Sequence, residues 1–309
     1  MNNKTYPYAF FENKFVKTGQ AKLSIMTNAV QYGTGVFDSV RGYYNKEKKI
    51  LSLFTTNDHY KRMLTSLKII GATVPYSAKE LEQITIDLVK KNKPTTDIYL
   101  RPYAYAPGNG VTPDIYANSK FDFALYMIPL GEYLPVDKGL SIMVSSWRRI
   151  SDNAIPSRAK ICGGYINSSL GRGEAARLGF DEAIMLTHDG HVAEGSAENF
   201  FMVKNGVLIT PSQTDDILEG ITRTCILQIA KDLGIPTEIR TIDRTELYTA
   251  EEAFFSGTGV QVAWIGKIDN RSIGTGKKGP ITTKLQELFF SIVHGNEKKY
   301  DWWCTKITI

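Results

Sequence analysis

Cysteine is scarce in this 309-residue sequence, and neither cysteine nor histidine forms a metal-binding pattern. Cys162, Cys225 and Cys304 are odd in number, far apart and without a CxxC pair, and the four histidines show no metal-ligand spacing. This usage excludes a disulfide framework and gives no support for a metal site. It is typical of a reducing compartment, so we expect a cytoplasmic protein.

Long apolar runs are also missing. No window approaches the ~20 apolar residues that a membrane-spanning helix needs. Residues 1–20 alternate polar with aromatic residues and lack the basic head and apolar core of a signal peptide. We therefore expect neither a membrane segment nor a leader.

A dense basic stripe is absent as well. The formal net charge is +5 and the lysines occur in short, scattered groups, whereas a nucleic-acid-binding surface concentrates its basic residues. The sequence also lacks the GxGxxG, P-loop, GxSxG and HExxH motifs. With 42% hydrophobic and 22% charged residues, it is a globular protein, and its length predicts about two domains.

Strand-like and helix-like segments alternate along the first half without a repeat. There we expect a hairpin at Tyr8–Val16 turning at Asn13-Lys14, a strand at 51–54, helices from Asn57 and over 77–92, and strands at 97–106 and 121–128. Apolar residues at 3.6-residue spacing from Tyr60 to Ile70 favour the first helix, and the capping box of Ser77 and Glu80 begins the second. A Pro/Gly-rich loop, 107–113, joins the last two strands, and such loops often line sites.

Segment 129–139 precedes the second half and carries two prolines and two glycines. We expect it to link a small N-terminal domain, 1–128, to a large C-terminal domain, 140–309. The second half predicts strands at 140–146, 182–187, 199–203, 207–210 and 253–256, and helices at 164–178, 222–233 and 280–294. Asn205-Gly206 is a hairpin signal. Mixed sheets with helices in two domains make the expected fold class α/β, with mixed α+β character.

Lys160 is the first candidate for chemistry. It lies in Ser157–Tyr165 among small and apolar residues and is followed by two glycines. A lysine that is buried there loses its proton more easily and can attack an aldehyde to form a Schiff base. The alternative, which is the commoner case for a lysine, is a solvated side chain in a loop.

The segment Leu218–Arg223 is the second candidate. Gly220 permits close approach of the backbone, Thr222 adds a hydroxyl, and the free amides at the start of the following helix could hold a phosphate. Gly257-Thr258-Gly259, at the end of a strand-like run, could add amides to the same anion site. Taken alone, a capped helix start is the simpler interpretation.

Glu194 and Glu198 are the third candidate. Both lie among small residues between two expected strands. A carboxylate held there could pair with the protonated ring nitrogen of pyridoxal phosphate (PLP), which needs such a partner to act as an electron sink. The alternative is a polar loop with its carboxylates in water.

Taken in order, these and other motifs closely resemble the class IV, fold-type IV PLP aminotransferases. The matching motifs are Tyr32–Phe37, Arg62 on its helix, Tyr99–Pro102, Lys160 with Gly163–Tyr165, Glu194–Asn199, Gly220–Arg223 and Ser256–Thr258. The nearest pattern within the family is branched-chain amino-acid aminotransferase, and the resemblance runs from about Tyr8 to the C-terminus. It implies two α/β domains with the cofactor between them, and a homodimer or larger homo-oligomer.

The resemblance assigns a residue to each part of the cofactor. Lys160 would form the internal aldimine and then move the proton between the substrate Cα and the cofactor C4′. Tyr165 would hydrogen-bond the phenolic oxygen, and Glu194 would hold the pyridine nitrogen. The implied cofactor-binding residues are Arg62, Lys160, Tyr165, Glu194, Ser196, Asn199, Leu218, Gly220, Ile221, Thr222, Gly257 and Thr258, of which Arg62, Ile221, Thr222 and Thr258 would cradle the phosphate.

The substrates implied by the resemblance are amino acids and 2-oxo acids. Arg101 would receive the side-chain carboxylate of glutamate or 2-oxoglutarate, while Phe37 and Leu130 would line the apolar part of the pocket. The implied substrate-binding residues are Tyr32, Phe37, Tyr99, Arg101, Leu130, Tyr133, Thr258, Gly259 and Val260. The reaction would be a ping-pong transfer of the amino group of Leu, Ile or Val to 2-oxoglutarate.

The sequence departs from the family pattern in the substrate region. Phe37–Arg41 reads Phe-Asp-Ser-Val-Arg where branched-chain enzymes usually read Phe-Glu-Gly-Ile-Arg, and Leu130 replaces a common aromatic residue. Gly259 and Val260 stand in place of the usual Ala-Ala, and their amides would bind the substrate α-carboxylate. (R)-primary amines, D-amino acids and aminodeoxychorismate lyase chemistry are therefore alternatives on the same fold. A non-catalytic or nucleic-acid-binding protein of this fold is a further alternative.

Overall fold

A two-residue turn opens the fold of the computed structural model, which describes residues 5–117 and 119–309. β1 (Tyr8–Phe11) pairs antiparallel with β2 (Lys14–Lys17), so that Phe11 lies opposite Lys14. Glu12 and Asn13 therefore form the turn, and both have positive φ (48° and 61°), as a type I′ turn requires. The predicted hairpin is confirmed, but its turn lies one residue earlier than expected.

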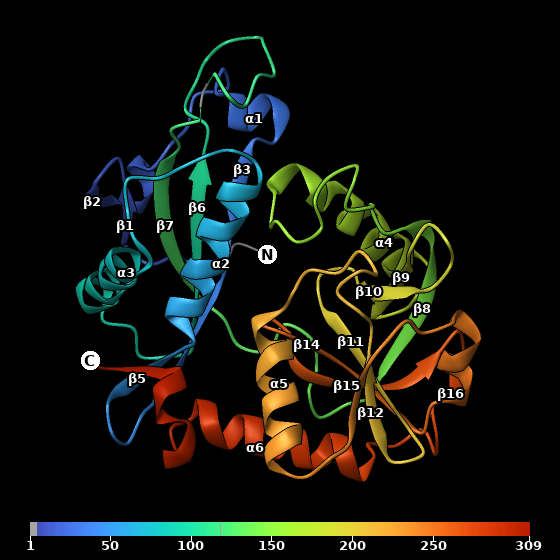
Figure 1. Ribbon diagram of the computed structural model, residues 1–309. Coiled ribbons are helices and arrows are strands. Elements are labelled where there is room, and N and C mark those ends of the chain that lie inside the picture. Colours follow the sequence, from blue (N-terminus) through green and yellow to red (C-terminus); the bar gives the residue numbers. More distant parts are fainter. Residues whose placement is uncertain (1–4, 118) are drawn as a thin grey trace. The chain divides into compact units, whose positions relative to one another are not determined.

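The chain divides into two units, each with its own sheet (Figure 1). The first unit comprises the described residues up to Gly131, together with Ala159–Gly163 and Ile292–Ile309; the second comprises Glu132–Arg158 and Gly164–Ser291. The division after Gly131 falls inside the expected linker, 129–139. Two later segments return to the first unit, which differs from the expectation that residues 140–309 form one continuous domain.

An eight-stranded antiparallel sheet forms the centre of the first unit. Besides β1 and β2, its strands are β3 (Gly35–Phe37), β4 (Val40–Asn45), β5 (Ile50–Phe54), β6 (Ile98–Tyr105), β7 (Asp122–Pro129) and β17 (Cys304–Thr308). Their order is β17-β5-β4-β6-β7-β1-β2, and β3 pairs with β6. The α-helices of this unit are α1 (Asn28–Tyr32), α2 (Thr56–Ile69) and α3 (Ala78–Asn92).

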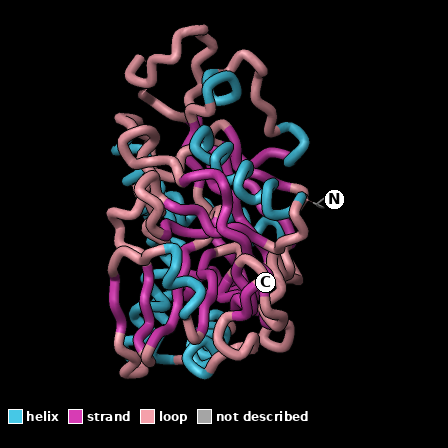
Figure 2. The backbone as a smooth tube through the Cα atoms, turned by 90° about the vertical axis from the view of Figure 1, so that its right-hand side faces the viewer, coloured by secondary structure: helices cyan, strands magenta, loops and turns pink. Residues whose placement is uncertain are grey.

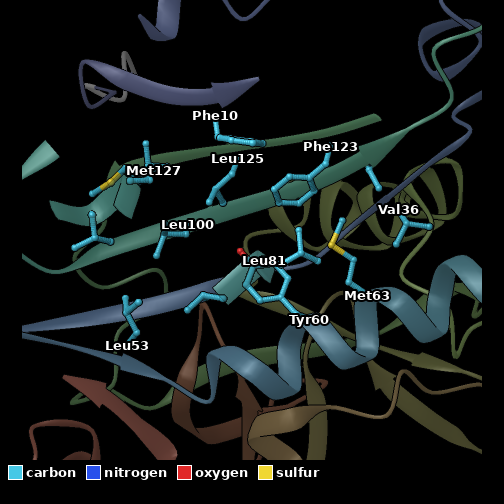
Figure 3. Packing of buried hydrophobic residues seen from close by; sticks show 14 of the residues in the cluster. Phe10, Val36, Leu53, Tyr60, Met63, Leu81, Leu100, Phe123, Leu125 and Met127 are labelled. Carbon is cyan, nitrogen blue, oxygen red and sulfur yellow. The ribbon is translucent and has the colours of Figure 1, made fainter. Parts of the chain in front are cut away.

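α2 and α3 pack apolar side chains against this sheet. Tyr60, Met63 and Leu67 recur along one side of α2, and Leu81 of α3 joins them in the same buried cluster. Figure 3 shows Tyr60, Met63 and Leu81 close to Phe123 of β7. The predicted apolar face of α2 is confirmed, and each such side chain stabilises the fold by ~1.5–3 kcal/mol when it is fully buried.

Local signals set the helix and turn boundaries as predicted. Ser77 Oγ accepts a hydrogen bond from the Glu80 amide, while the Glu80 carboxylate accepts one from the Ser77 amide (2.7 Å), which completes the capping box of α3. Asn205 and Gly206 both have positive φ (51° and 74°) and form the turn of the second predicted hairpin.

The loop between β6 and β7 contacts α1. The Asn28 amide donates to the Gly108 carbonyl (2.7 Å), and the Tyr32 hydroxyl donates to the Val111 carbonyl (2.6 Å). Figure 2 draws most of this connection as loop, in pink. The Pro/Gly-rich segment 107–113 is therefore fastened to the short helix that carries Tyr32.

A nine-stranded mixed sheet forms the centre of the second unit. Its strands are β8 (Leu140–Arg148), β9 (Glu182–Leu186), β10 (Val192–Gly195), β11 (Asn199–Lys204), β12 (Val207–Thr210), β13 (Thr237–Ile239), β14 (Glu252–Gly257), β15 (Gln261–Ile268) and β16 (Arg271–Ser272), in the order β10-β9-β8-β15-β14-β11-β12-β13 with β16 beside β15. The pairs β8–β9, β8–β15 and β12–β13 are parallel. The helices are α4 (Tyr165–Arg177), α5 (Ile221–Asp232) and α6 (Pro280–Val293), whose last two residues belong to the first unit.

The C-terminal strand is the main element that the sequence did not predict. β17 pairs with β5 along its length, with Cys304 opposite Phe54, so the chain end completes the edge of the first sheet. Pairing between segments so far apart in the sequence is not encoded in any local pattern. β4, β15 and α1 were also missed, because none of them has a clear period of two or 3.6 residues.

Within residues 5–117 and 119–309, no helix combines the length and the apolar character that crossing a membrane requires.

Candidate active site

Lys160 lies in the first unit, where backbone hydrogen bonds fasten it to β3 and α2. The Lys160 carbonyl accepts from the Phe37 amide (3.1 Å), and the Lys160 amide donates to Oγ of Ser66 (3.1 Å). The next residue, Ile161, forms an antiparallel bridge with Val36. Lys160 is 8% exposed. The structure therefore has the buried lysine that the small and apolar neighbours predicted, rather than a solvated one.

Burial lowers the pKa of Lys160 to about 8. Desolvation penalises the ammonium and is the largest cause, and the nearby guanidinium of Arg62 lowers the pKa further. An ordinary lysine, with a pKa of ~10.4, has roughly one uncharged amine in 2,500 at pH 7, whereas a pKa of about 8 leaves roughly one in ten. Lys160 thus supplies a useful fraction of nucleophilic amine near neutral pH.

Arg62 belongs to a buried charged cluster with Asp38 and His59. Nε and Nη2 of Arg62 donate to the two carboxylate oxygens of Asp38 (3.0 and 2.7 Å), and Nδ1 of His59 lies 2.7 Å from Asp38 Oδ1. Burial alone would raise the pKa of Asp38, but Arg62 and His59 hold that pKa well below its usual range. The ionised carboxylate fixes the plane of the Arg62 guanidinium.

Phe37, Tyr99 and Arg101 lie together beside Lys160. The Arg101 guanidinium carbon is 4.4 Å from the centroid of the Phe37 ring, and Lys160 Nζ is 5.0 Å from the same centroid. Arg101 Nη2 donates to the Tyr99 hydroxyl (2.9 Å). The same ring therefore meets both the amine and the guanidinium, and the first unit brings these four predicted residues into one group.

Tyr32 and Leu130, also predicted for the substrate pocket, are held through the backbone. The Gly33 carbonyl, next to Tyr32, accepts from the Gly163 amide (3.1 Å). Gly33 has φ of +65°, and a Cβ there would lie 2.8 Å from Gly163 Cα, so only glycine suits this close approach. Leu130 follows β7, and its amide donates to the Asp97 carbonyl (3.1 Å).

Glu194, on β10 of the second unit, accepts from a guanidinium, a side-chain amide and a backbone amide. Its Oε1 pairs with Arg149 Nη2 (2.9 Å), and its Oε2 accepts from Asn199 Nδ2 (3.0 Å) and from the Leu218 amide (3.2 Å). Arg149 Nη1 donates to Oγ of Ser168 on α4 (3.2 Å). Glu194 is 3% exposed, so the alternative of a solvated carboxylate does not apply. The adjacent guanidinium favours its charged form.

Asn199 connects Glu194 to the start of α5. Besides its bond to Glu194, Asn199 Nδ2 donates to the Leu218 carbonyl (2.8 Å). Its Oδ1 lies so close to Gly220 that a Cβ there would be 1.8 Å away. Gly220 is the N-cap of α5, which leaves the amides of Ile221 and Thr222 without helical acceptors, as in other anion-binding helix starts.

The turn after β14 lies beside the same strand. Asn199 is the register partner of Ser256, so Gly257 and Thr258 follow directly after a residue paired with it. A Cβ on Gly259 would lie 3.7 Å from Cγ and Cδ1 of the Tyr133 ring. The second unit therefore brings Glu194, Gly220 and this turn close to Asn199.

Two predicted residues direct their side chains elsewhere. Ser196 is 2% exposed and its hydroxyl donates to Glu182. Val260 is 1% exposed and belongs to the apolar core of the second unit. Contacts of these two residues with a small molecule would have to be made by the backbone.

The family of this protein follows from its sequence together with this geometry. The family model described as Amino-transferase class IV matches residues 35–268. The chain belongs to the class IV aminotransferases. The matched range includes Lys160, Glu194, the start of α5 and the Gly257–Gly259 turn.

Relatives of this class IV aminotransferase align over nearly the whole chain. The probable branched-chain-amino-acid aminotransferase of Aquifex aeolicus is 45% identical over 97% of this chain and 96% of its own. The crystal structure of the branched-chain aminotransferase of Thermoproteus uzoniensis with norvaline has a TM-score of 0.93 and 42% identity over 98% of this chain and 99% of that one. The T.th. branched-chain amino acid aminotransferase complexed with N-(5'-phosphopyridoxyl)-L-glutamate has a TM-score of 0.92 and 35% identity over 97% of this chain and 98% of that one.

Three buried partners of candidate site residues were not predicted from the sequence: Asp38, His59 and Arg149. Asp38 was noted as a departure from the family pattern, but its partners were not. The spacing of His59 and Arg62, three residues apart on a predicted helix, places them on one face and could have suggested their shared carboxylate. Arg149 follows a strand without any local sign of its distant partner Glu194.

Proposed function

We propose that this protein is a PLP-dependent branched-chain amino-acid aminotransferase, which transfers the amino group of L-leucine, L-isoleucine or L-valine to 2-oxoglutarate by a ping-pong reaction. Full-length similarity to branched-chain aminotransferases supports the substrate class. The buried Lys160, with its pKa of about 8, is the observation that carries the chemistry.

The side chains of the candidate residues fit the chemical groups of PLP. Lys160 is an amine suited to an aldehyde, and Glu194 is a buried carboxylate suited to a protonated pyridine nitrogen. The α5 N-terminus offers backbone amides to a phosphate, and Gly220 leaves no side chain over them. Arg62 adds a cation whose guanidinium plane is already fixed by Asp38.

Each proposed role corresponds to an atom of this chain. Lys160 Nζ would hold the aldehyde carbon and, once a substrate amine has displaced it, would move a proton to and from the substrate Cα. Tyr165, the first residue of α4, would donate to the phenolic oxygen. Glu194, paired with Arg149, would keep the ring nitrogen protonated. When bound, PLP supplies an electron sink for the bonds at Cα.

Arg101 would receive the second carboxylate of glutamate or 2-oxoglutarate. Its guanidinium contacts the Phe37 ring and donates to Tyr99, so its orientation is set before a substrate arrives. For leucine, Phe37 and Leu130 would provide the apolar surface. The amides of the Thr258–Val260 turn would bind the α-carboxylate that both substrates share.

Absorption spectroscopy of the purified protein tests the proposal. PLP-loaded protein is mixed in turn with L-leucine, L-glutamate, D-alanine and (R)-1-phenylethylamine, and the loss of the lysine-bound cofactor band is followed. We expect L-leucine and L-glutamate to convert the band. Conversion by D-alanine or by the amine alone would contradict the substrate class, and absence of any cofactor band after PLP addition would contradict the enzyme itself.

Two further measurements accompany this test. Lys160→Ala should abolish turnover, whereas Lys267→Ala, at an exposed position of β15, should leave it unchanged. We also infer from the family resemblance that the protein is at least a dimer, which sedimentation analysis would decide.

A further inference from the structure

Arg172, which no sequence motif singled out, contacts both a buried carboxylate and an aromatic ring. It lies on α4, seven residues after Tyr165 and therefore on the same helix face. Its Nη1 forms an ion pair with Glu182, and its guanidinium carbon is 4.9 Å from the centroid of the Tyr133 ring. A planar guanidinium near an aromatic ring is a favourable arrangement.

Glu182 is a firm anchor for this guanidinium. It is 0% exposed at the first position of β9. Its carboxylate also accepts from the Ala183 amide (2.8 Å) and from the Ser196 hydroxyl. Removing one partner of a buried ion pair leaves the other charge uncompensated in the interior, which is costly. Arg172 therefore cannot turn away from Glu182 without a large penalty.

A second buried acid, Glu198, faces the same cluster. It is 4% exposed, and its pKa is raised to about 8, first by burial and then by the charge of Glu182. Burial raises the pKa of Glu182 as well, and Arg172 opposes that rise, so the two buried acids share one guanidinium.

Tyr133 needs support from outside its own segment. It lies in the connection between β7 and β8, which contains neither helix nor strand at this point, and it is 43% exposed. Its ring rests on Gly259, where a Cβ would be 3.7 Å from two ring carbons. The ring thus has one contact on the turn proposed for the substrate carboxylate and another on Arg172.

We propose that Arg172 is a positioning residue, which holds the Tyr133 ring against the Gly259 turn and so sets the width of the substrate end of the site. The proposal rests on the proposed function, because Tyr133 and this turn are assigned to the substrate there. Arg172 acts through Tyr133 and not on the reacting atoms. Its loss should therefore raise KM more than it lowers kcat.

Three variants separate stacking from charge. Arg172→Lys keeps a cation near Glu182 and removes the planar guanidinium. Arg172→Met removes both, and is combined with Glu182→Gln so that no buried charge is left uncompensated. Tyr133→Ala removes the ring that Arg172 is proposed to hold. All three are compared with the wild type in KM and kcat for L-leucine and L-glutamate, and in hydrogen exchange of residues 132–139.

For the Arg172→Met/Glu182→Gln protein, we expect both KM values to rise about two- to fivefold. A change of this size corresponds to the loss of one partly exposed cation–π contact. kcat should change by less than about twofold, and residues 132–139 should exchange faster. Arg172→Lys should show part of the same KM increase with an unchanged melting temperature. In a protein that already carries Tyr133→Ala, the Arg172 substitution should have no further effect on KM.

Unchanged exchange of residues 132–139 would overturn the proposal, as would full additivity of the Arg172 and Tyr133 substitutions. Equal losses of kcat and melting temperature in every variant would assign Arg172 a merely structural role, and would also overturn it. If the wild-type protein turns over none of the amino acids, the proposed function fails, and the exchange measurement still decides whether Arg172 holds Tyr133.

Discussion

Arg149 Nη2 lies 2.9 Å from Glu194 Oε1, and both side chains are almost fully buried. Arg149 directly follows β8, and Glu194 is on β10, so the pair joins two strands that are not neighbours in the sheet. The guanidinium compensates the negative charge that so deeply buried a carboxylate carries when it is ionised. In the proposed function, this geometry suits Glu194 to a cationic ring nitrogen.

Replacing Arg149 should therefore be costly for both stability and cofactor binding. Arg149→Met leaves Glu194 uncompensated, and we expect the free energy of unfolding to fall by about 3–5 kcal/mol and the affinity for PLP to fall with it. Thermal denaturation and titration with PLP measure the two effects. Arg148→Met, at the exposed neighbouring position, is the control and should change stability by less than ~0.5 kcal/mol. Equal behaviour of the two variants would contradict the role of the pair.

Asp38 offers a second test, in the first unit. Asp38→Asn removes the charge that fixes Arg62, so we expect weaker PLP retention on dialysis and a loss of about 3 kcal/mol in stability. The folded-state pKa of Asp38 lies below the unfolded value of ~3.9. The contribution of Asp38 to the free energy of unfolding is therefore complete above about pH 5 and is lost as the pH falls through the folded-state pKa.

The stability difference between wild type and Asp38→Asn should accordingly be constant from about pH 7 to pH 8, as measured by urea denaturation. Below that range it should grow, because Asp38 favours protonation of His59 and an asparagine in its place does not. Asp58→Asn is a matched control, because Asp58 lies on the same helix as Arg62 but is exposed and pairs with Lys61. A difference that changes between about pH 7 and pH 8 would show that a group outside Asp38 and His59 governs this cluster.

Short-range signals predicted much of the fold. The hairpin turn at Asn205-Gly206, the capping box at Ser77 and the apolar face of α2 each depend on residues within one or two turns of chain. The positions of these elements were predicted correctly. The turn of the first hairpin was predicted one residue too late, because Glu12 adopts positive φ although it is neither Asn nor Gly. β17 could not be found in this way, since its pairing with β5 depends on the folded first unit.

The same difference between short-range and long-range signals applies to the candidate site. Lys160, Glu194 and Gly220 were candidates because small residues and glycines surround them in the sequence, and the family resemblance assigned their roles. Lys160 and Glu194 are buried, and Gly220 is closely approached by Asn199. The partners Arg149, Asp38 and His59 were missed because each meets its carboxylate or cation only after distant segments fold together. Charge compensation in an interior is a three-dimensional property that spacing does not record.

The pKa of Lys160 leads to a prediction about cofactor capture. Apoprotein is mixed with a fixed concentration of PLP between about pH 6 and pH 10, and the rate at which the cofactor band appears is recorded. The unprotonated amine is the nucleophile, so the rate should rise about tenfold per pH unit well below pH 8 and level off above it. A rate that keeps rising beyond about pH 9.5 would indicate an ordinary lysine. Lys160→Ala provides the blank.

Gly220 gives the sharpest steric test, because a Cβ there would lie 1.8 Å from Asn199 Oδ1. Gly220→Ala must displace the Asn199 amide, which would also disturb its bonds to Glu194 and Leu218. We expect a loss of about 1–3 kcal/mol in stability and a large loss of PLP affinity. Gly173→Ala is the matched control, since no atom lies within 4 Å of the added methyl on α4.

In that helix the control substitution should stabilise the protein by ~0.5–1 kcal/mol, because alanine has the higher helix propensity. If thermal denaturation shows that Gly220→Ala destabilises the protein and Gly173→Ala stabilises it, the requirement for glycine is specific to the start of α5. If Gly220→Ala instead kept full stability and PLP affinity, the close approach of Asn199 to this helix start would not be needed to hold the cofactor's phosphate.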